Sequence, residues 1–280
     1  MKNTSNTVYF FYKTTLGRFL LKLIMKLHLD RIAVRFLWSP WSKPLIKWYI
    51  KKNNLPITPK ERKKYNTYRE LFVRTRKNNF IDTTPNHLIS PCDGWLSIFP
   101  IDSHSCFSIK NAYYNLNELL QDKKLTSNYQ NGICMVFRLC ISDYQHYCYI
   151  DDGFQGENHH IPETFHSVQP IAYEKYPVYI HSKRCWCLLT TEHFGPVVQC
   201  EIGALIVGDI FNEAENIRFH KGYEKGHFEL AGSAIVLLFE PKQITLKPEL
   251  TTLLSQFPEV RVTQGEWIGN SERNSTQYEA

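Results

Sequence analysis

A serine that follows a glycine marks the stretch of this chain in which chemistry is easiest to place. Gly232-Ser233 lies in KGYEKGHFELAGSAIVLLFE, residues 221–240, directly before the apolar run AIVLLF. That run is short, consists of residues that favour strands and ends at Pro241, so it predicts a buried strand. Glycine and serine are ordinary turn residues, and the pair alone indicates a turn at the strand entrance. A serine hydroxyl is a weak nucleophile, and it is commonly activated by a neighbouring base that an acid orients.

Three other segments contain residue types that could supply that acid or base. SPCDG, residues 90–94, is a turn pattern that contains Asp93. RLCISDYQHYCYIDDG, residues 138–153, places His146 and Cys148 among acidic residues, with a spacing that matches no metal site. FGPVVQCEIGALIVGDI, residues 194–210, contains three glycines but neither a GxGxxG nor a P-loop pattern, which argues against nucleotide binding.

The eight cysteines argue against a structural metal. No two of them form a Cys-x-x-Cys motif, so we expect no zinc site and no other metal. The N-terminus lacks an apolar core followed by a small-residue cleavage site, so we expect no signal peptide. The thiols are therefore expected to be reduced, as in a cytosol.

The first part of the chain is strongly basic. Residues 1–77 contain 19 Lys/Arg and 3 Asp/Glu, whereas residues 78–280 contain 14 and 24. Leucines and lysines at helical spacing predict a basic amphipathic helix over 13–29, and three tryptophans follow between further lysines. This pattern favours a segment in the lipid headgroup layer, and the alternative is an ordinary helix packed on the body. The apolar content and the absence of a recognition motif argue against nucleic acid.

The remaining chain predicts a mainly β body. Short apolar or alternating runs begin near residue 85 and are separated by Gly, Pro, Asn and Asp. We therefore expect an α+β fold with a mainly antiparallel β body and an N-terminal basic amphipathic helical region. The expected parts are that helical region with its connector over 1–80, the body over 81–270 and a loose polar tail over 271–280.

Taken together and in order, these segments resemble the phosphatidylserine decarboxylases, which are pyruvoyl-dependent membrane enzymes. The resemblance covers roughly residues 85–270. It rests on the motifs SPCDG, IKNAYYNLNELL, RLCISDYQHYCYIDDG, HSVQPIA, TTEHFGPVVQCEIGALIVGDI, KGYEKGHFELAGSAIVLLFE and VRVTQGEWIG.

The resemblance implies that the chain cuts itself at the Gly232-Ser233 bond. The hydroxyl of Ser233 would attack the preceding carbonyl to give an ester, and elimination with loss of nitrogen would leave a pyruvoyl group. The products would be a large β chain, 1–232, and a small α chain, 233–280, that begins with this group. The pyruvoyl ketone would form a Schiff base with the amine of phosphatidylserine and accept electrons as CO2 leaves, which yields phosphatidylethanolamine.

The resemblance also assigns catalytic positions, with one departure. The acid of the family's Pro-x-Asp-Gly motif falls on Asp93. The family's histidines lie in an Asp-Tyr-His-x-x-His pattern that reads DYQHYC here, so Gln145 and Cys148 stand where histidines are expected. His146 lies between them and has the chemistry of a base, although one residue of offset in a strand turns it to the opposite face. We therefore predict Ser233, Asp93, His146 and Cys148 as catalytic residues, with His166 and His193 as distant alternatives for the base.

These features support an active decarboxylase that acts on phosphatidylserine at an anionic membrane surface, peripherally on the cytoplasmic face. One alternative is a decarboxylase-like lipid-binding protein whose processing is impaired by Gln145 and Cys148. Another is pyruvoyl chemistry on a different amine-bearing acid. The two chains of one precursor would remain partners, and the sequence is compatible with a homo-oligomer.

Overall fold

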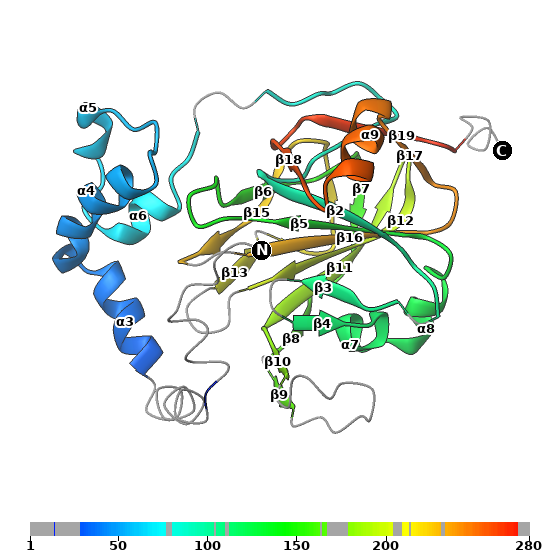
Figure 1. The fold of residues 1–280 in the computed structure, drawn as a ribbon, viewed down its shortest axis with the longest axis horizontal. Helices are drawn as coiled ribbons and strands as arrows, with labels where there is room; N and C mark the ends of the chain where they lie inside the picture. The colour runs from blue at the N-terminus through cyan, green and yellow to red at the C-terminus, as the bar shows by residue number, and fades with distance from the viewer. Residues whose placement is uncertain are drawn as a thin grey trace. The chain divides into compact units, whose positions relative to one another are not determined.

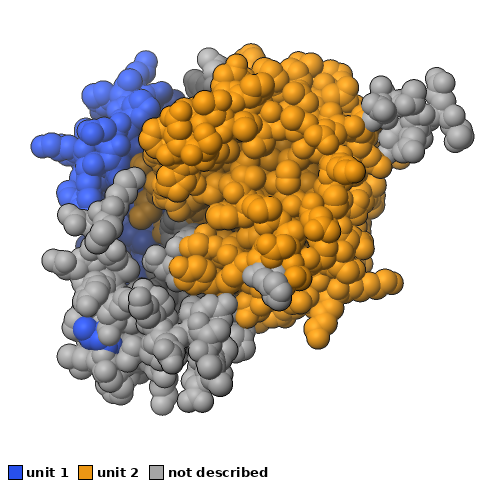
Figure 2. Space-filling model, turned by 45° about the vertical axis from the view of Figure 1, so that its right-hand side comes forward, with its two compact units in different colours: residues 1–72 blue, residues 73–280 orange. Residues whose placement is uncertain are grey.

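The protein divides into two compact units. The computed structural model describes residues 14, 29–76, 80–103, 105–109, 112–162, 164–166, 179–203, 209–212, 214–230 and 233–273. The units are residues 1–72 and 73–280, which are blue and orange in Figure 2. The basic amphipathic helix predicted over 13–29 lies almost entirely outside the described residues.

The first unit is helical. Its elements are α3 (Leu29–Trp38), the 3-10 helix η1 (Pro40–Ser42), α4 (Lys43–Lys52), α5 (Pro59–Arg62) and α6 (Tyr68–Phe72). Ile46, Tyr49 and Leu71 belong to its small buried core. Thr58 and Glu61 form a capping box that starts α5, since each side chain accepts from the other residue's backbone N–H. No helix among the described residues is both long enough and apolar enough to cross a bilayer.

The second unit is built mainly from short strands. They are β1 (His87–Ile89), β2 (Gly94–Pro100), β3 (Phe107–Ile109), β4 (Ala112–Tyr114), β5 (Ile133–Arg138), β6 (His146–Cys148), β7 (Gly153–Gln155), β8 (His159–Ile161), β9 (Thr164–His166), β10 (Tyr179–His181), β11 (Arg184–Thr191), β12 (Gly195–Ile202), β13 (Asp209–Asn212), β14 (Ile217–Phe219), β15 (Glu224–Glu229), β16 (Ala234–Phe239), β17 (Ile244–Leu246), β18 (Val260–Val262) and β19 (Trp267–Ser271), with helices α7 (Leu116–Leu120), α8 (Lys123–Ser127) and α9 (Pro248–Gln256). All strand pairs in the described part of the chain are antiparallel. The predicted α+β class with a mainly antiparallel β body is confirmed.

The strand predicted after Ser233 lies in the middle of the largest sheet. It is β16, and the strand order is β14-β7-β11-β12-β16-β5-β2-β18, with β8 paired to β11. All six residues of β16 are buried. An uninterrupted apolar run fits a central strand that is covered on both faces, whereas a strand with one wet face would alternate. Ser233, the residue before this run, therefore lies at the start of a strand in the middle of the core.

Two hydrophobic clusters cover the two faces of this sheet. Alternate residues of β16 from Ile235 onward belong to a cluster that includes residues of β1, β19 and α9. Those from Ala234 onward belong to a cluster with residues of β3, β4 and α7. Figure 1 shows α9 on one side of the large sheet and α7 with α8 on the other. Each fully buried Val, Leu or Ile side chain contributes about 1.5–3 kcal/mol, so β16 is anchored firmly from both sides.

A three-stranded sheet of order β13-β15-β6 carries the segment that leads toward Ser233. Its β15–β6 register pairs Glu224 with Cys148, Gly226 with Tyr147 and His227 with His146. Three steps along β15 thus match two steps along β6, which is a β-bulge at Lys225. The bulge changes which side chains of β15 share a face.

Candidate active site

Ser233 is fixed at the entrance of the central strand. It is 1 % exposed, and its carbonyl accepts a hydrogen bond from the N–H of Leu139 at 2.9 Å. The last register pair on this side is Ala234 with Arg138, so Ser233 lies one step further along, opposite Leu139. Gly232 lies outside the described residues. The hydroxyl-bearing residue of the predicted cleavage site is therefore held by the sheet, directly after the bond that it would attack.

The SPCDG motif ends at the first residue of β2, which pairs with β5 on the side away from β16. Trp95 pairs with Arg138, which places Gly94 opposite Leu139 on the side away from Ser233. Since strands are about 4.8 Å apart, the backbones of Gly94 and Ser233 are separated by about 10 Å. A Cβ on Gly94 would lie 3.1 Å from the Arg138 carbonyl oxygen, so only glycine fits this approach without displacement. The sheet thus brings Asp93 and Ser233, which are far apart in sequence, to the same end of two strands that both pair with β5.

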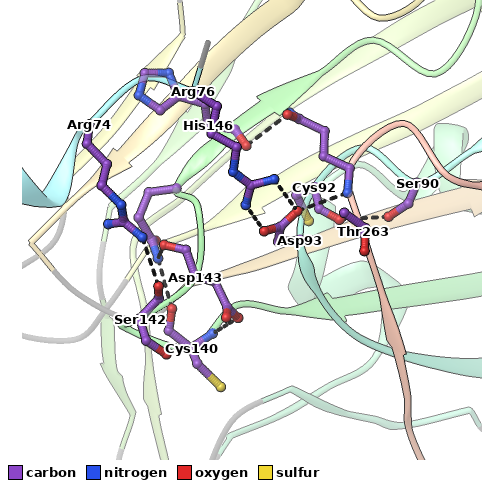
Figure 3. A network of polar contacts seen from close by, with 12 residues as sticks. Arg74, Arg76, Ser90, Cys92, Asp93, Cys140, Ser142, Asp143, His146 and Thr263 are labelled. Carbon is purple, nitrogen blue, oxygen red and sulfur yellow. Dashed lines mark hydrogen bonds and ion pairs between the residues drawn. The ribbon is translucent and has the colours of Figure 1, made fainter. Parts of the chain in front are cut away.

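Asp93 is bound by an arginine. Both terminal guanidinium nitrogens of Arg76 donate to its carboxylate, and the backbone N–H of Gln264 donates at 3.0 Å. Figure 3 shows this two-pronged contact. Arg76 also lies over the ring of Tyr144 at 4.3 Å. The buried carboxylate is therefore charge-compensated, and the partner of the predicted acid in the uncut chain is Arg76 rather than a histidine.

The residue at the family's first histidine position makes structural hydrogen bonds. Gln145 is fully buried, and its amide nitrogen donates to the carbonyls of Cys140 at 2.8 Å and Asp143 at 3.0 Å. Its amide oxygen is buried and has no hydrogen-bond partner among the described residues. Asp143, in turn, accepts from both terminal nitrogens of Arg261 at 2.9 Å. Gln145 and Asp143 therefore hold the corner of the chain that precedes β6.

His146 is engaged on both ring nitrogens. Nδ1 lies 2.6 Å from the carboxylate of Glu224, and Nε2 lies 3.1 Å from the carbonyl oxygen of Val73. The ring stacks between Tyr144 and His227, with centroid distances of 4.8 and 5.0 Å. Figure 3 shows the imidazole pointing away from Asp93. The structure therefore does not bring His146 to the predicted acid, and places it beside Glu224 and His227, with which it could hold a metal ion.

Cys148 lies in the hydrophobic core beside the SPCDG motif. Its N–H donates to the carbonyl of Pro91 at 2.9 Å, and its sulfur lies 4.0 Å from the carbonyl oxygen of Ser90. Burial raises the pKa of the Cys148 thiol to about 12. A thiolate at this position is therefore strongly disfavoured near neutral pH, which removes the simplest way for Cys148 to act as a base.

The alternative bases are also placed by the structure. The ring of His193 donates through Nδ1–H to Asp151 at 2.8 Å, and the other oxygen of Asp151 accepts from the His193 backbone N–H at 2.7 Å. His166 ends β9, and its side chain lies outside the described residues. His193 is thus part of an Asp–His pair in the loop that follows β11.

A buried ion pair near Ser233 was not predicted from the sequence. The ammonium of Lys225 lies 2.8 Å from the carboxylate of Glu201, and both side chains are fully buried. Glu201 pairs with Ile235, so it occupies the sheet position diagonal to Ser233, which brings long side chains within reach. Gln199 and Asn212 donate further hydrogen bonds to Glu201. A charged residue within the apolar run VVQCEIGALIVG was the one sequence feature that pointed to this cluster.

Electrostatics favour the charged form of this lysine. Burial alone would lower the pKa of Lys225, but the surrounding groups, above all the Glu201 carboxylate at 2.8 Å, outweigh burial and raise it above its ordinary value. Burial raises the pKa of the Cys187 thiol to about 12. The cluster is therefore a hydrogen-bonded ammonium–carboxylate pair, in which the buried amide oxygen of Gln199 has no hydrogen-bond partner among the described residues.

Comparison with known proteins matches both the motifs and the extent of the fold. The model of the phosphatidylserine decarboxylase family matches residues 68–270. The phosphatidylserine decarboxylase proenzyme 2 of Clostridium acetobutylicum is 38% identical over 266 residues, which cover 94% of this chain and 91% of that protein. The proenzyme of Clostridium botulinum is 33% identical over 92% of this chain and 90% of its own length, and that of Ruminiclostridium cellulolyticum is 33% identical over 92% and 89%. The chain belongs to the phosphatidylserine decarboxylase family.

Proposed function

We propose that this chain is a proenzyme that cuts itself between Gly232 and Ser233 and then decarboxylates phosphatidylserine to phosphatidylethanolamine. The single observation that supports this most directly is the position of Ser233. It is buried at the entrance of β16, its carbonyl is fixed by Leu139, and the Asp93 motif lies two strands away. Family membership supplies the carboxy-lyase activity and the self-processing.

The surroundings of Ser233 suit a prosthetic group made from the chain itself. A pyruvoyl group formed from Ser233 would supply a ketone that binds the substrate amine and withdraws electrons as CO2 leaves. Cleavage before Ser233 leaves β16 paired to β12 and β5 along its whole length. The hydrogen bond from Leu139 to the Ser233 carbonyl also lies on the retained side of the cut. The new N-terminus of the small chain therefore stays in the core, where water is excluded.

Maturation needs a proton to leave the Ser233 hydroxyl and another to reach the departing backbone nitrogen. Asp93 is the acid that the motif provides, and Arg76 holds it in place. Movement of Arg76 would free the carboxylate for a proton-carrying partner. The buried pair of Lys225 and Glu201 would hold the other side of the same entrance.

Intact mass spectrometry of the purified protein tests this proposal. We expect two chains, 1–232 and 233–280, with a carbonyl-reactive group at the start of the small chain. Ser233→Ala should give a single uncut chain that lacks carbonyl reactivity. A wild-type preparation that remains uncut, or that is cut at another bond, would contradict the proposal. Release of CO2 from phosphatidylserine vesicles, present in wild type and lost in Ser233→Ala, tests the decarboxylation step separately.

We further propose that the first unit binds the surface of an anionic membrane, on the cytoplasmic face. Trp41 is 81% exposed, and Trp38 and Trp48 are also exposed. Lys47, Lys51 and Lys52 lie on α4 with Trp48. Exposed tryptophans among lysines suit the headgroup region of a bilayer that contains anionic lipid. Trp41→Ala with Trp48→Ala should weaken sedimentation with phosphatidylserine-containing vesicles, and unchanged sedimentation would contradict this placement.

A further inference from the structure

We propose that His146, Glu224 and His227 form a binding site for a divalent transition-metal ion of the zinc class. Each of these residues offers one ligand atom, and the three atoms lie within 4.8 Å of one another. We refer to the three residues as the His–Glu–His cluster. The inference concerns residues outside the Ser233 region and does not depend on the proposed reaction.

The backbone builds this cluster through the β-bulge of β15. His227 lies directly opposite His146 in the register, and the two rings stack at 5.0 Å. Residues three apart in a regular strand face opposite sides of a sheet. The bulge at Lys225 removes one step of that alternation, so Glu224 also reaches the side of His146 and contacts its ring at 2.6 Å. Sequence spacing could not reveal the cluster, because His146 and Glu224 lie 78 residues apart.

One nitrogen of His146 contacts a carbonyl oxygen and its other nitrogen faces Glu224, whereas His227 has one nitrogen at ion-pair distance from a carboxylate and a second without a hydrogen-bond partner among the described residues. Nε2 of His146 lies 3.1 Å from the Val73 carbonyl, so this nitrogen is the donor and Nδ1 is the one that faces Glu224. Nε2 of His227 lies 3.6 Å from the carboxylate of Glu229. Contacts of this kind, to a carbonyl or a carboxylate, orient metal-binding histidines in proteins.

Nδ1 of His227 is the ligand atom for which a bound ion would supply a missing interaction. It is buried and has no hydrogen-bond partner within the part of the chain that the structure describes. A buried polar atom without a partner is destabilising, because it has lost its hydrogen bond to water and gained none in return. A bound cation would use the lone pair of this nitrogen and offset that loss.

The donor set selects the class of metal. Two imidazoles and one carboxylate suit zinc and similar transition metals, whereas calcium and magnesium prefer oxygen ligands. Tetrahedral ligands with bonds of about 2.0–2.1 Å lie about 3.3 Å apart, so around an ion the His146–Glu224 pair, now at 2.6 Å, must open while any wider separation closes. Glu224 can make that adjustment, because its side chain is 42% exposed. The same exposure leaves room for a water molecule as fourth ligand.

A metal here would link three segments of the body. It would connect β6 to β15 directly and would fix the His146 ring that contacts the Val73 carbonyl. Nδ1 of His146 would then serve as a ligand and could not accept a proton from Ser233. The expectation that the chain has no metal site rested on the spacing of the cysteines and of the residues within 138–153. Spacing within one segment does not reveal ligands from another strand, and Glu224 and His227 lie on β15.

Metal titration of the purified protein, prepared without a histidine tag, tests the site. We expect a single equivalent of Zn²⁺ to remain bound after dialysis, as measured by elemental mass spectrometry, and Co²⁺ to give a visible absorption spectrum at the same stoichiometry. His227→Gln and Glu224→Gln should each weaken binding at least about 10-fold. His220→Gln is the matched control, since this exposed histidine pairs with Asp152 outside the cluster and its loss should leave the affinity unchanged.

A second readout keeps the test decisive if one variant folds poorly. Zn²⁺ should raise the melting temperature of the wild type and of His220→Gln, but not that of Glu224→Gln, whose exposed side chain can be changed without opening the core. Near-ultraviolet circular dichroism checks the fold of each variant. Wild type without saturable Zn²⁺ or Co²⁺ binding would overturn the proposal. Wild-type affinity in a folded Glu224→Gln or His227→Gln variant would do the same.

Discussion

Arg76 binds both carboxylate oxygens of Asp93, the acidic residue of the SPCDG motif. The backbone N–H of Gln264 completes the set at 3.0 Å. Asp93 is buried, so these contacts replace the hydration that its charge would have in water. The arginine therefore determines how the acid is oriented before cleavage.

Loss of Arg76 should destabilise the uncut chain. In a Ser233→Ala background, which keeps every sample as a single chain, Arg76→Gln leaves the buried Asp93 carboxylate without its cation. Because the Arg76 side chain is 33% exposed, water can replace part of the contact, and we expect a loss of about 1–3 kcal/mol in the free energy of unfolding. Urea denaturation measures this loss. Arg74→Gln, which removes a bond to the Ser142 carbonyl, should cost less, and equal losses would contradict the assigned role of the pair.

Burial of Cys148 predicts how stability varies in alkaline solution. The pKa of its thiol is about 12 in the folded protein, against an ordinary value of 9.0. Between those values the unfolded chain has released the proton while the folded chain keeps it, so the free energy of unfolding falls as pH rises. One such thiol contributes a slope of up to about 1.4 kcal/mol per pH unit, and no slope well below pH 9.

Comparison of the wild type with Cys148→Ala isolates this effect. Urea denaturation at a series of pH values from about 9.5 to 11 should give a shallower slope for the variant. Cys106→Ala, at an exposed position, serves as the control and should keep the wild-type slope. The rate of self-cleavage tests the opposite possibility. If that rate rises with a midpoint at about pH 8.5 in the wild type, and this pH dependence is absent in Cys148→Ala, the thiolate acts as base.

The elements set by local pattern could be predicted from the sequence. The apolar run after Ser233 predicts a buried strand, and β16 occupies those residues at the centre of the sheet. The resemblance to the family implies that Asp93 serves the same site as Ser233, and this role stays a prediction; the register places Gly94 and Ser233 on either side of Leu139. The strand prediction is confirmed because hydrophobic periodicity and turn chemistry act over a few neighbouring residues.

Contacts between distant residues could not be predicted in the same way. The pairing of Lys225 with Glu201 depends on which strands become neighbours and on a bulge that turns one side chain inward. The partners of His146 depend on the same bulge and on the path of the chain at Val73. Gln145 and Cys148 were recognisable as departures from the family pattern. Their environments, a hydrogen-bonded corner and an apolar core, follow only from tertiary packing.

Gly94 should be intolerant of a side chain. A Cβ at this position would lie 3.1 Å from the carbonyl oxygen of Arg138 and 3.3 Å from its carbonyl carbon, so the backbone of β5 at Arg138, which also pairs with Ala234, would have to shift slightly. We expect Gly94→Ala to lower the melting temperature and to slow self-cleavage, followed by the ratio of cut to uncut chain on a denaturing gel. Gly156→Ala is the control, because the nearest atom to its Cβ would be 3.6 Å away. Equal behaviour of the two variants would contradict the argument from close approach.

Lys225 and Glu201 form a buried ion pair, so replacing one of them should lower the free energy of unfolding strongly unless the other is replaced as well. Lys225→Met should cost about 3–5 kcal/mol of unfolding free energy, because it leaves the Glu201 carboxylate charged, buried and unpaired. Glu201→Leu combined with Lys225→Met should recover most of that loss, since two apolar residues then replace both charges.

The Lys225–Glu201 pair should also affect the rate of self-cleavage, because it lies close to Ser233. Glu201 is the diagonal sheet neighbour of Ser233, so an unpaired carboxylate there should disturb the entrance of β16 and slow self-cleavage. We expect slow cleavage in Lys225→Met and faster cleavage in the double variant, measured by intact mass at fixed times after synthesis. Lys183→Met, which breaks a surface pair with Asp209, should change stability by no more than about 1 kcal/mol and leave cleavage unaltered. A double variant that is stable but does not cut itself would show that the charges take part in maturation directly, beyond their effect on packing.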